Sequence, residues 1–142
     1  MLQRMEDLRF LDHTGDIGFE VKAATIEDLF RRAARGLYEI LVERMPAPGG
    51  GEEKLELEEE GADLLLRSFL SELLYRFLAR RTMFVEFTDL RVEGNRLTAR
   101  GLVAAFDPDR DGLRTELKAV TYHQLEIRRQ PSGWSARVIF DV

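Results

Sequence analysis

Two segments carry apolar residues at helical spacing, and they constrain the fold more than any other feature of the chain. In residues 25–43 apolar side chains recur every three or four positions, as in an amphipathic helix. Residues 62–81 repeat the pattern with a broader stripe, and their last basic residues, Arg80 and Arg81, suit the negative end of a helix dipole. Both stripes need an apolar surface to cover them.

The rest of the chain supplies that surface as strands. The strands are expected at residues 17–23, 53–60, 83–93, 96–106, 117–129 and 133–142. Gly94–Asn95 and residues 130–133 predict hairpin turns, so the pairing is expected to be largely antiparallel. We therefore expect an α+β fold: two amphipathic helices on one face of a largely antiparallel sheet of about six strands. At 142 residues, 1–142 is expected to form a single domain.

Composition narrows the classes of function. The chain has no cysteine, so disulfides and thiolate chemistry are excluded, and zinc would have only two histidines. The net charge of −5 argues against a protein that binds RNA phosphates by itself. No uncharged apolar run is long enough to span a membrane and no signal-like segment is evident, so we expect a cytoplasmic protein with no membrane partner.

Two short polar motifs could carry chemistry. The first, "HTGDIG" at residues 13–18, places Asp16 between two glycines that allow unusual backbone angles. On these residues alone, ordinary Asx and Ser/Thr turns are the favoured interpretation. The second, "KAVTYH" at residues 118–123, is expected at the start of a strand. There the plain interpretation is a core ring for Tyr122 and a hydrogen-bonded strand residue for His123.

The segment "DPDRDG" at residues 107–112 resembles the opening of an EF-hand calcium loop. The twelfth position of such a loop should be glutamate, but here it is Lys118, and the flanking segments are predicted strands rather than helices. We therefore reject an EF-hand and expect a solvated turn at the tip of a hairpin.

The chain ends in "SARVIFDV", which places the Asp141 carboxylate beside the terminal carboxylate of Val142. Hard cations such as Ca²⁺ prefer several anionic oxygens, so this pair is half of a possible metal site. A third oxygen must come from elsewhere in the chain. Without it, an ordinary C-terminal strand explains the segment equally well.

The segments "DHTGDIG", "KAVTYH" and "WSARVIFDV" together resemble the archease family, and the resemblance covers essentially the whole chain. Gly15 departs from the family pattern, in which alanine is usual. The resemblance implies an archease-like fold and a protein cofactor rather than an enzyme. Archeases activate the RtcB-type RNA ligase of tRNA splicing and RNA repair, which joins 3′-phosphate or cyclic phosphate ends to 5′-hydroxyl ends. They promote guanylylation of the ligase and its multiple turnover.

The resemblance also assigns residues. It implies a divalent metal, Ca²⁺ with Mg²⁺ or Mn²⁺ as alternatives, held by Asp16, Asp141 and the carboxylate of Val142. It ties Lys118 to ligase activation. Supporting positions are His13, Thr14, Tyr122 and His123.

The implied partner is the ligase, with tRNA reached only through it, and the oligomeric state is left open. The alternative functions are a chaperone-like module for several RNA-processing or modification enzymes, a metal-dependent hydrolase, and direct tRNA binding. The scarcity of metal ligands and base–nucleophile pairs argues against the hydrolase.

Overall fold

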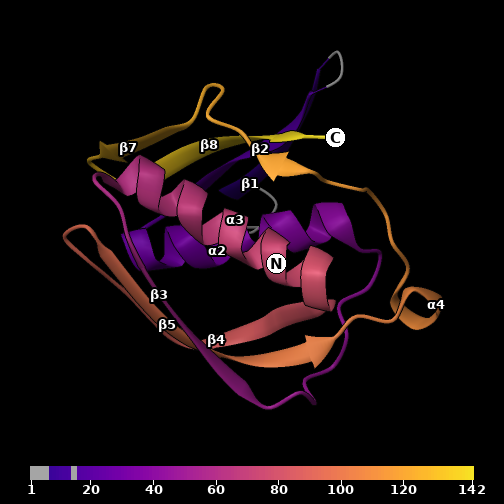
Figure 1. Ribbon diagram of the computed structural model, residues 1–142. Coiled ribbons are helices and arrows are strands. Elements are labelled where there is room, and N and C mark those ends of the chain that lie inside the picture. Colours follow the sequence, from indigo (N-terminus) through magenta and orange to yellow (C-terminus); the bar gives the residue numbers. More distant parts are fainter. Residues whose placement is uncertain (1–6, 14–15) are drawn as a thin grey trace.

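The computed structural model describes residues 7–13 and 16–142, and for residues 12, 13 and 16 it describes the backbone only (Figure 1). The elements in chain order are β1 (Leu8–His13), β2 (Asp16–Ala23), α2 (Ile26–Leu41), β3 (Glu52–Glu58), α3 (Ala62–Arg80), β4 (Thr82–Glu93), β5 (Arg96–Ala105), α4 (Pro108–Asp111), β6 (Ala119–Val120), β7 (Glu126–Gln130) and β8 (Gly133–Asp141).

These strands form two antiparallel sheets. One has the order β1-β2-β8-β6, with β7 also paired to β8, and the other has the order β3-β5-β4. Figure 1 shows α2 and α3 lying between the two sheets, and each helix contacts strands of both. The predicted α+β class and antiparallel pairing are confirmed. The expectation of one sheet with both helices on a single face is wrong, because the strands divide between two sheets.

The apolar surface of the helices explains this division. Seven side chains of α3 are buried: Leu65, Leu66, Phe69, Leu70, Leu73, Leu74 and Phe77. They occupy a broad face of the helix, and α3 contacts strands of both sheets as well as α2. Phe69 of α3 meets Phe30 of α2, with 5.6 Å between ring centroids, and Phe87 of β4 at 5.5 Å. The helices therefore form the central layer of a continuous core.

Two strand boundaries differ from the sequence-based expectation. Residues 8–13 form strand β1, paired with β2 from Leu8↔Val21 to His13↔Asp16, although no strand was expected there. The strand expected at 117–129 is divided into β6 and β7. The chain turns between them, and Gln124 takes a left-handed conformation with φ of 51° that strands do not allow.

Helix α2 is fixed at its start and tied to the second sheet near its end. The Thr25 side chain accepts a hydrogen bond from the backbone N–H of Asp28 at 3.1 Å, which caps the helix. Tyr38 is 2% exposed, and its hydroxyl accepts a hydrogen bond from the N–H of Phe84 in β4 at 3.0 Å. Burial raises the pKa of this hydroxyl far above its usual value, so Tyr38 stays neutral while the protein is folded.

The "DPDRDG" segment is a short helix in the connection between the two sheets, so the hairpin-tip expectation is wrong. Asp111 is 3% exposed and is the buried charged side chain among the described residues. Its carboxylate accepts hydrogen bonds from Arg110 at 2.9 Å and from the N–H of Asp107 at 3.0 Å. Because Arg110 stabilises the charged form, the pKa of Asp111 falls to about 2.

Gly18 allows β2 and β8 to approach each other closely. A Cβ atom built at Gly18 would lie 2.2 Å from the carbonyl oxygen of Val138. We expect Gly18→Ala to lower the free energy of unfolding by about 2 kcal/mol, because β2 must move away from β8. Urea denaturation measures this change. Gly49→Ala is the matched control, since nothing lies within 4 Å of the corresponding Cβ, and equal stability of the two variants would contradict the packing argument.

Asp111 should make the free energy of unfolding depend on pH in the acid range. Its folded-state pKa of about 2 lies below the ordinary value of 3.8, so the stabilisation is present above pH 4 and is lost as pH falls from about 4 to about 2. We therefore expect the stability difference between wild type and Asp111→Asn to shrink over this range. Thermal unfolding at several pH values tests this, with Asp109→Asn in the same turn as the control; a difference independent of pH would contradict it.

Candidate functional site

Three segments that are far apart in sequence meet at one edge of the larger sheet. Ile17 of β2 and Val120 of β6 both pair with Phe140, from opposite sides of β8. The start of β2, the end of β8 and the residues around β6 therefore lie side by side, as Figure 1 shows. We call this place the motif edge and define it by Asp16, Lys118, Asp141 and Val142.

Backbone hydrogen bonds hold the "KAVTYH" segment against the end of β8. The N–H of Lys118 donates to the carbonyl oxygen of Asp141 at 2.8 Å. The N–H and the hydroxyl of Thr121 both donate to the carbonyl of Ile139 at 3.0 Å. Thr121 in turn accepts from the N–H of His123 at 3.1 Å. The segment is thus held by its backbone and by the Thr121 hydroxyl, and the Lys118 side chain is left exposed.

Arg67 of α3 holds the same segment from the other side. Its Nε donates to the carbonyl oxygen of Val120 at 3.0 Å. Its guanidinium carbon lies 3.8 Å from the centroid of the Tyr122 ring, a distance typical of a cation–π contact. Nothing in the sequence distinguished Arg67 from other helix-surface arginines, because both of its contacts depend on how α3 packs against β6.

The positions of Tyr122 and His123 differ from expectation. Tyr122 is 65% exposed, so the interpretation as a core ring is wrong. His123 is also exposed and lies in the turn between β6 and β7, so it is not a strand residue. Both side chains stand at the surface near the motif edge, where a partner can reach them.

The donor chemistry of the motif edge suits a hard divalent cation. Asp141 and Val142 are both exposed, and the backbone of Asp16 begins the strand beside them. Carboxylate oxygens are the ligands that such cations prefer. No group of three histidine, aspartate or glutamate side chains that could bind a metal occurs among the side chains that the structure describes, which do not include that of Asp16.

Several predicted site residues lie outside the described residues. Thr14 and Gly15 are not described at all, and the side chains of His13 and Asp16 are not described. The structure therefore neither brings these side chains together nor separates them. What it does place is the backbone of Asp16 at the first residue of β2. The role of Gly18 is steric: it permits the close contact with β8 and needs no unusual backbone angle.

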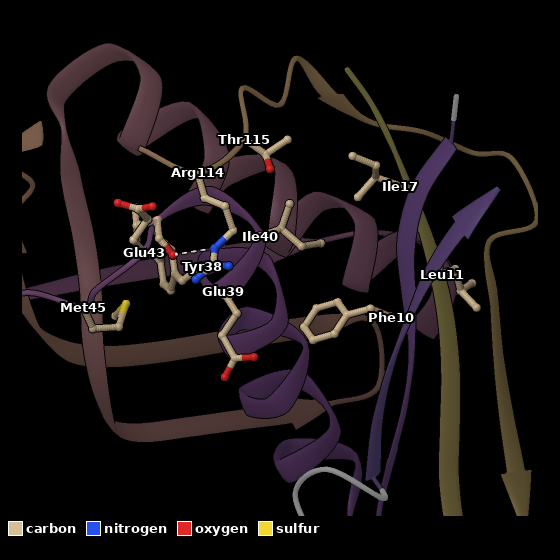
Figure 2. Close-up of a pocket in the computed structure, with 11 residues that line it drawn as sticks. Phe10, Leu11, Ile17, Tyr38, Glu39, Ile40, Glu43, Met45, Arg114 and Thr115 are labelled. Atoms are coloured by element: carbon tan, nitrogen blue, oxygen red, sulfur yellow. Dashed lines mark hydrogen bonds between the residues drawn. The ribbon is translucent and has the colours of Figure 1, made fainter. Parts of the chain in front are cut away.

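A groove of about 520 Å³ opens next to the motif edge, and Ile17, the residue after Asp16, lines it. Figure 2 shows Phe10 and Ile40 lining the groove from the strand side and the helix side. Arg114 extends from the connection between the sheets, and its Nε donates to the carbonyl of Val42 at 3.5 Å. Phe10 is 48% exposed, so the groove adds accessible apolar surface beside the motif edge. Sequence reasoning did not find this groove, because its lining comes from β1, β2, α2, the segment just after α2 and residues 114–115 together.

No helix within residues 7–13 and 16–142 combines the length and the apolar character needed to cross a membrane.

Comparison with known proteins gives a consistent result. Residues 8–142 match the model of the Archease protein family (MTH1598/TM1083). The chain is 34% identical to Protein archease of Methanosarcina barkeri, over all of both chains. It is 36% identical to Protein archease of Methanopyrus kandleri, over 93% of this chain and 96% of that protein.

Solved structures show the same fold. The solution structure of Methanobacterium thermoautotrophicum protein 1598 superimposes with a TM-score of 0.78 and is 28% identical, covering 97% of this chain and all of the other. A crystal structure from Thermotoga maritima, described as an archease and possible chaperone, has a TM-score of 0.65 at 21% identity, covering 93% of this chain and 94% of that one. Family model, relatives and fold therefore agree with the motifs gathered at one sheet edge: the chain belongs to the archease family.

Proposed function

We propose that this protein activates an RtcB-type RNA ligase. It promotes guanylylation of the ligase and its multiple turnover in joining 3′-phosphate or cyclic phosphate ends to 5′-hydroxyl RNA ends, in tRNA splicing and RNA repair. In this proposal it is a protein cofactor rather than an enzyme, it acts in the cytoplasm, and it reaches tRNA only through the ligase.

The hydrogen bond between the Lys118 N–H and the Asp141 carbonyl, 2.8 Å long, is the observation that supports this proposal most directly. It joins the two later family motifs at the sheet edge where β2 begins, and β2 starts with the last three residues of the first motif. The side chains of Lys118, Tyr122 and Asp141 are exposed around this bond, which supports a role for them in binding a partner.

In this proposal Asp16, Asp141 and the carboxylate of Val142 would hold a divalent cation, Ca²⁺ with Mg²⁺ or Mn²⁺ as alternatives. Such an ion supplies concentrated positive charge that can bind phosphate or carboxylate oxygens. The residues of the chain do the rest: β8 fixes the direction of Asp141, and the bond to Asp141 fixes where Lys118 leaves the sheet. The ammonium group of Lys118, on its flexible side chain, can then pair with an acidic group of the ligase or with the phosphate of a bound nucleotide.

A chaperone-like module for several RNA-processing or modification enzymes is the second candidate. The exposed apolar side chains of Phe10 and Met45 at the groove are the observation that favours it. The two candidates differ in specificity. A ligase activator stimulates its cognate ligase and leaves unrelated clients unchanged, whereas a chaperone-like module suppresses the aggregation of many clients.

Replacing Asp141 should remove activation and leave the fold intact. Because its side chain is exposed at the end of β8, we expect Asp141→Ala to change stability by less than about 0.5 kcal/mol. The loss of an anionic ligand should weaken Ca²⁺ binding by about 10-fold or more and abolish stimulation of multiple-turnover ligation. Calorimetric titration with Ca²⁺ and a ligation assay measure the two effects. Asp89→Ala is the control, because this aspartate lies on β4 of the other sheet with its side chain 50% exposed. Full stimulation by folded Asp141→Ala would refute the role of the Asp141 carboxylate.

A C-terminal extension should act like a mutation of the site. Adding a few residues after Val142 converts the proposed terminal carboxylate ligand into a neutral amide, so Ca²⁺ affinity and ligase stimulation should both fall while the melting temperature stays unchanged. The same tag at the N-terminus serves as the control. Equal metal binding and stimulation by the two tagged proteins would show that the terminal carboxylate is not a ligand.

A further inference from the structure

A pocket of about 330 Å³ lies between the end of α3 and the connection that leads from α4 to β6. Its floor is apolar and buried: Leu41, Phe77 and Leu117 are all 2% exposed or less. Its rim includes Leu78, 47% exposed, and Leu113, 36% exposed. Above this floor the two rim leucines leave an apolar surface open to solvent, where a single side chain of a partner could be buried.

The charged residues at this pocket are mostly basic. Arg81 and Lys118 line it, against the single carboxylate of Glu116. This is the reverse of the whole chain, whose net charge is −5. An apolar pocket with a basic rim is complementary to an aliphatic or aromatic side chain that has a carboxylate beside it.

The guanidinium of Arg81 is held in position without a carboxylate. Its central carbon lies 5.2 Å from the centroid of the Phe77 ring and 5.7 Å from that of Phe106. In the part of the chain that the structure describes, no acidic side chain forms an ion pair with it. Arg76, which lies one and a half turns earlier in α3, differs because it pairs with Glu53 at 2.9 Å and with Glu72 at 2.8 Å. The guanidinium N–H groups of Arg81 therefore remain available to donate hydrogen bonds to a ligand.

The backbone at Arg81 is also unusual. Arg81 caps α3 in the left-handed conformation, with φ of 51° and ψ of 35°, where glycine is the ordinary residue. A side chain in this conformation is strained, so stability alone favours glycine at this position. An arginine at this position is explained if its guanidinium binds a ligand.

From these observations we propose that this pocket is a docking site for an acidic segment of the partner ligase, which inserts one apolar side chain and places a carboxylate against Arg81 and Lys118. The inference rests on the proposed function and deepens it. Lys118 belongs both to the pocket and to the motif edge, so docking here would anchor the ligase next to the edge that activates it.

Each purified variant is titrated into the cognate ligase. Two quantities are measured: direct binding to the ligase and the guanylylation of the ligase. We expect Arg81→Gly to raise the half-saturating concentration by about 10-fold or more, because a charge-assisted contact is lost. The maximal stimulation at saturation should be unchanged, because the motif edge is intact. The melting temperature should equal or exceed that of wild type. Glycine adopts the left-handed conformation without strain, and this gain offsets the loss of the guanidinium contacts with the two rings.

A second variant tests the apolar half of the pocket independently. Leu78→Glu should also raise the half-saturating concentration, because it replaces the apolar rim with a charge that repels the proposed carboxylate. Tyr75→Glu on the same helix is the matched control: Tyr75 is 60% exposed and does not line the pocket. Arg91→Gln on β4 is the corresponding control for loss of an arginine.

The outcomes separate the two proposals. If wild type does not stimulate the ligase, the proposed function fails, and this docking site fails with it. If wild type stimulates and both Arg81→Gly and Leu78→Glu match it in half-saturation, only the docking site is refuted. If GTP alone binds wild type and not Arg81→Gly, the pocket holds a nucleotide, and its assignment to a protein segment is refuted.

Discussion

Strand β8 is the element on which the rest of the structure depends. It is paired with β2 along one side and with both β6 and β7 along the other. Val138 and Phe140 of β8 are each no more than 1% exposed, and Phe140 packs against Phe19 of β2 with ring centroids 5.6 Å apart. The last strand in the chain is thus the central strand of its sheet. The larger sheet and the motif edge therefore depend on the pairing of β8 with β2, which are more than one hundred residues apart in the sequence.

This dependence explains which parts of the structure were predictable. The helices α2 and α3 were expected within two residues of their ends, because helical periodicity is a local property. The division into two sheets was not, since strand alternation reports which side chains are buried and not which strand is the neighbour. Strand β1 was missed because Phe10 and Leu11 break the alternation, and β1 lies at the edge of its sheet. The turn that separates β6 from β7 was missed because Gln124 is not a usual left-handed residue.

The candidate site was predictable only in part, and for the same reason. The motifs could be identified residue by residue, and the resemblance assigned Asp16, Lys118, Asp141 and Val142. The contacts that support them come from tertiary packing. Arg67 belongs to α3 but contacts Val120 and Tyr122, more than fifty positions later in the chain. In the sequence, Arg81 looked like an ordinary basic residue at the end of a helix. Only its backbone angles and the two aromatic rings next to its guanidinium distinguish it from other arginines.

The connection from α4 to β6 links these features physically. Asp111, paired with Arg110, fixes its start, and Gly112 and Arg114 bond to the backbone at the end of α2. The connection then passes between the groove and the pocket, because Thr115 lines both. It ends at Lys118, whose N–H donates to the carbonyl oxygen of Asp141. Because the segment is tied at its start, middle and end, it holds the groove, the pocket and the motif edge in one fixed arrangement. A partner that spans these surfaces therefore binds a preorganised face. This protein then loses little conformational entropy on binding.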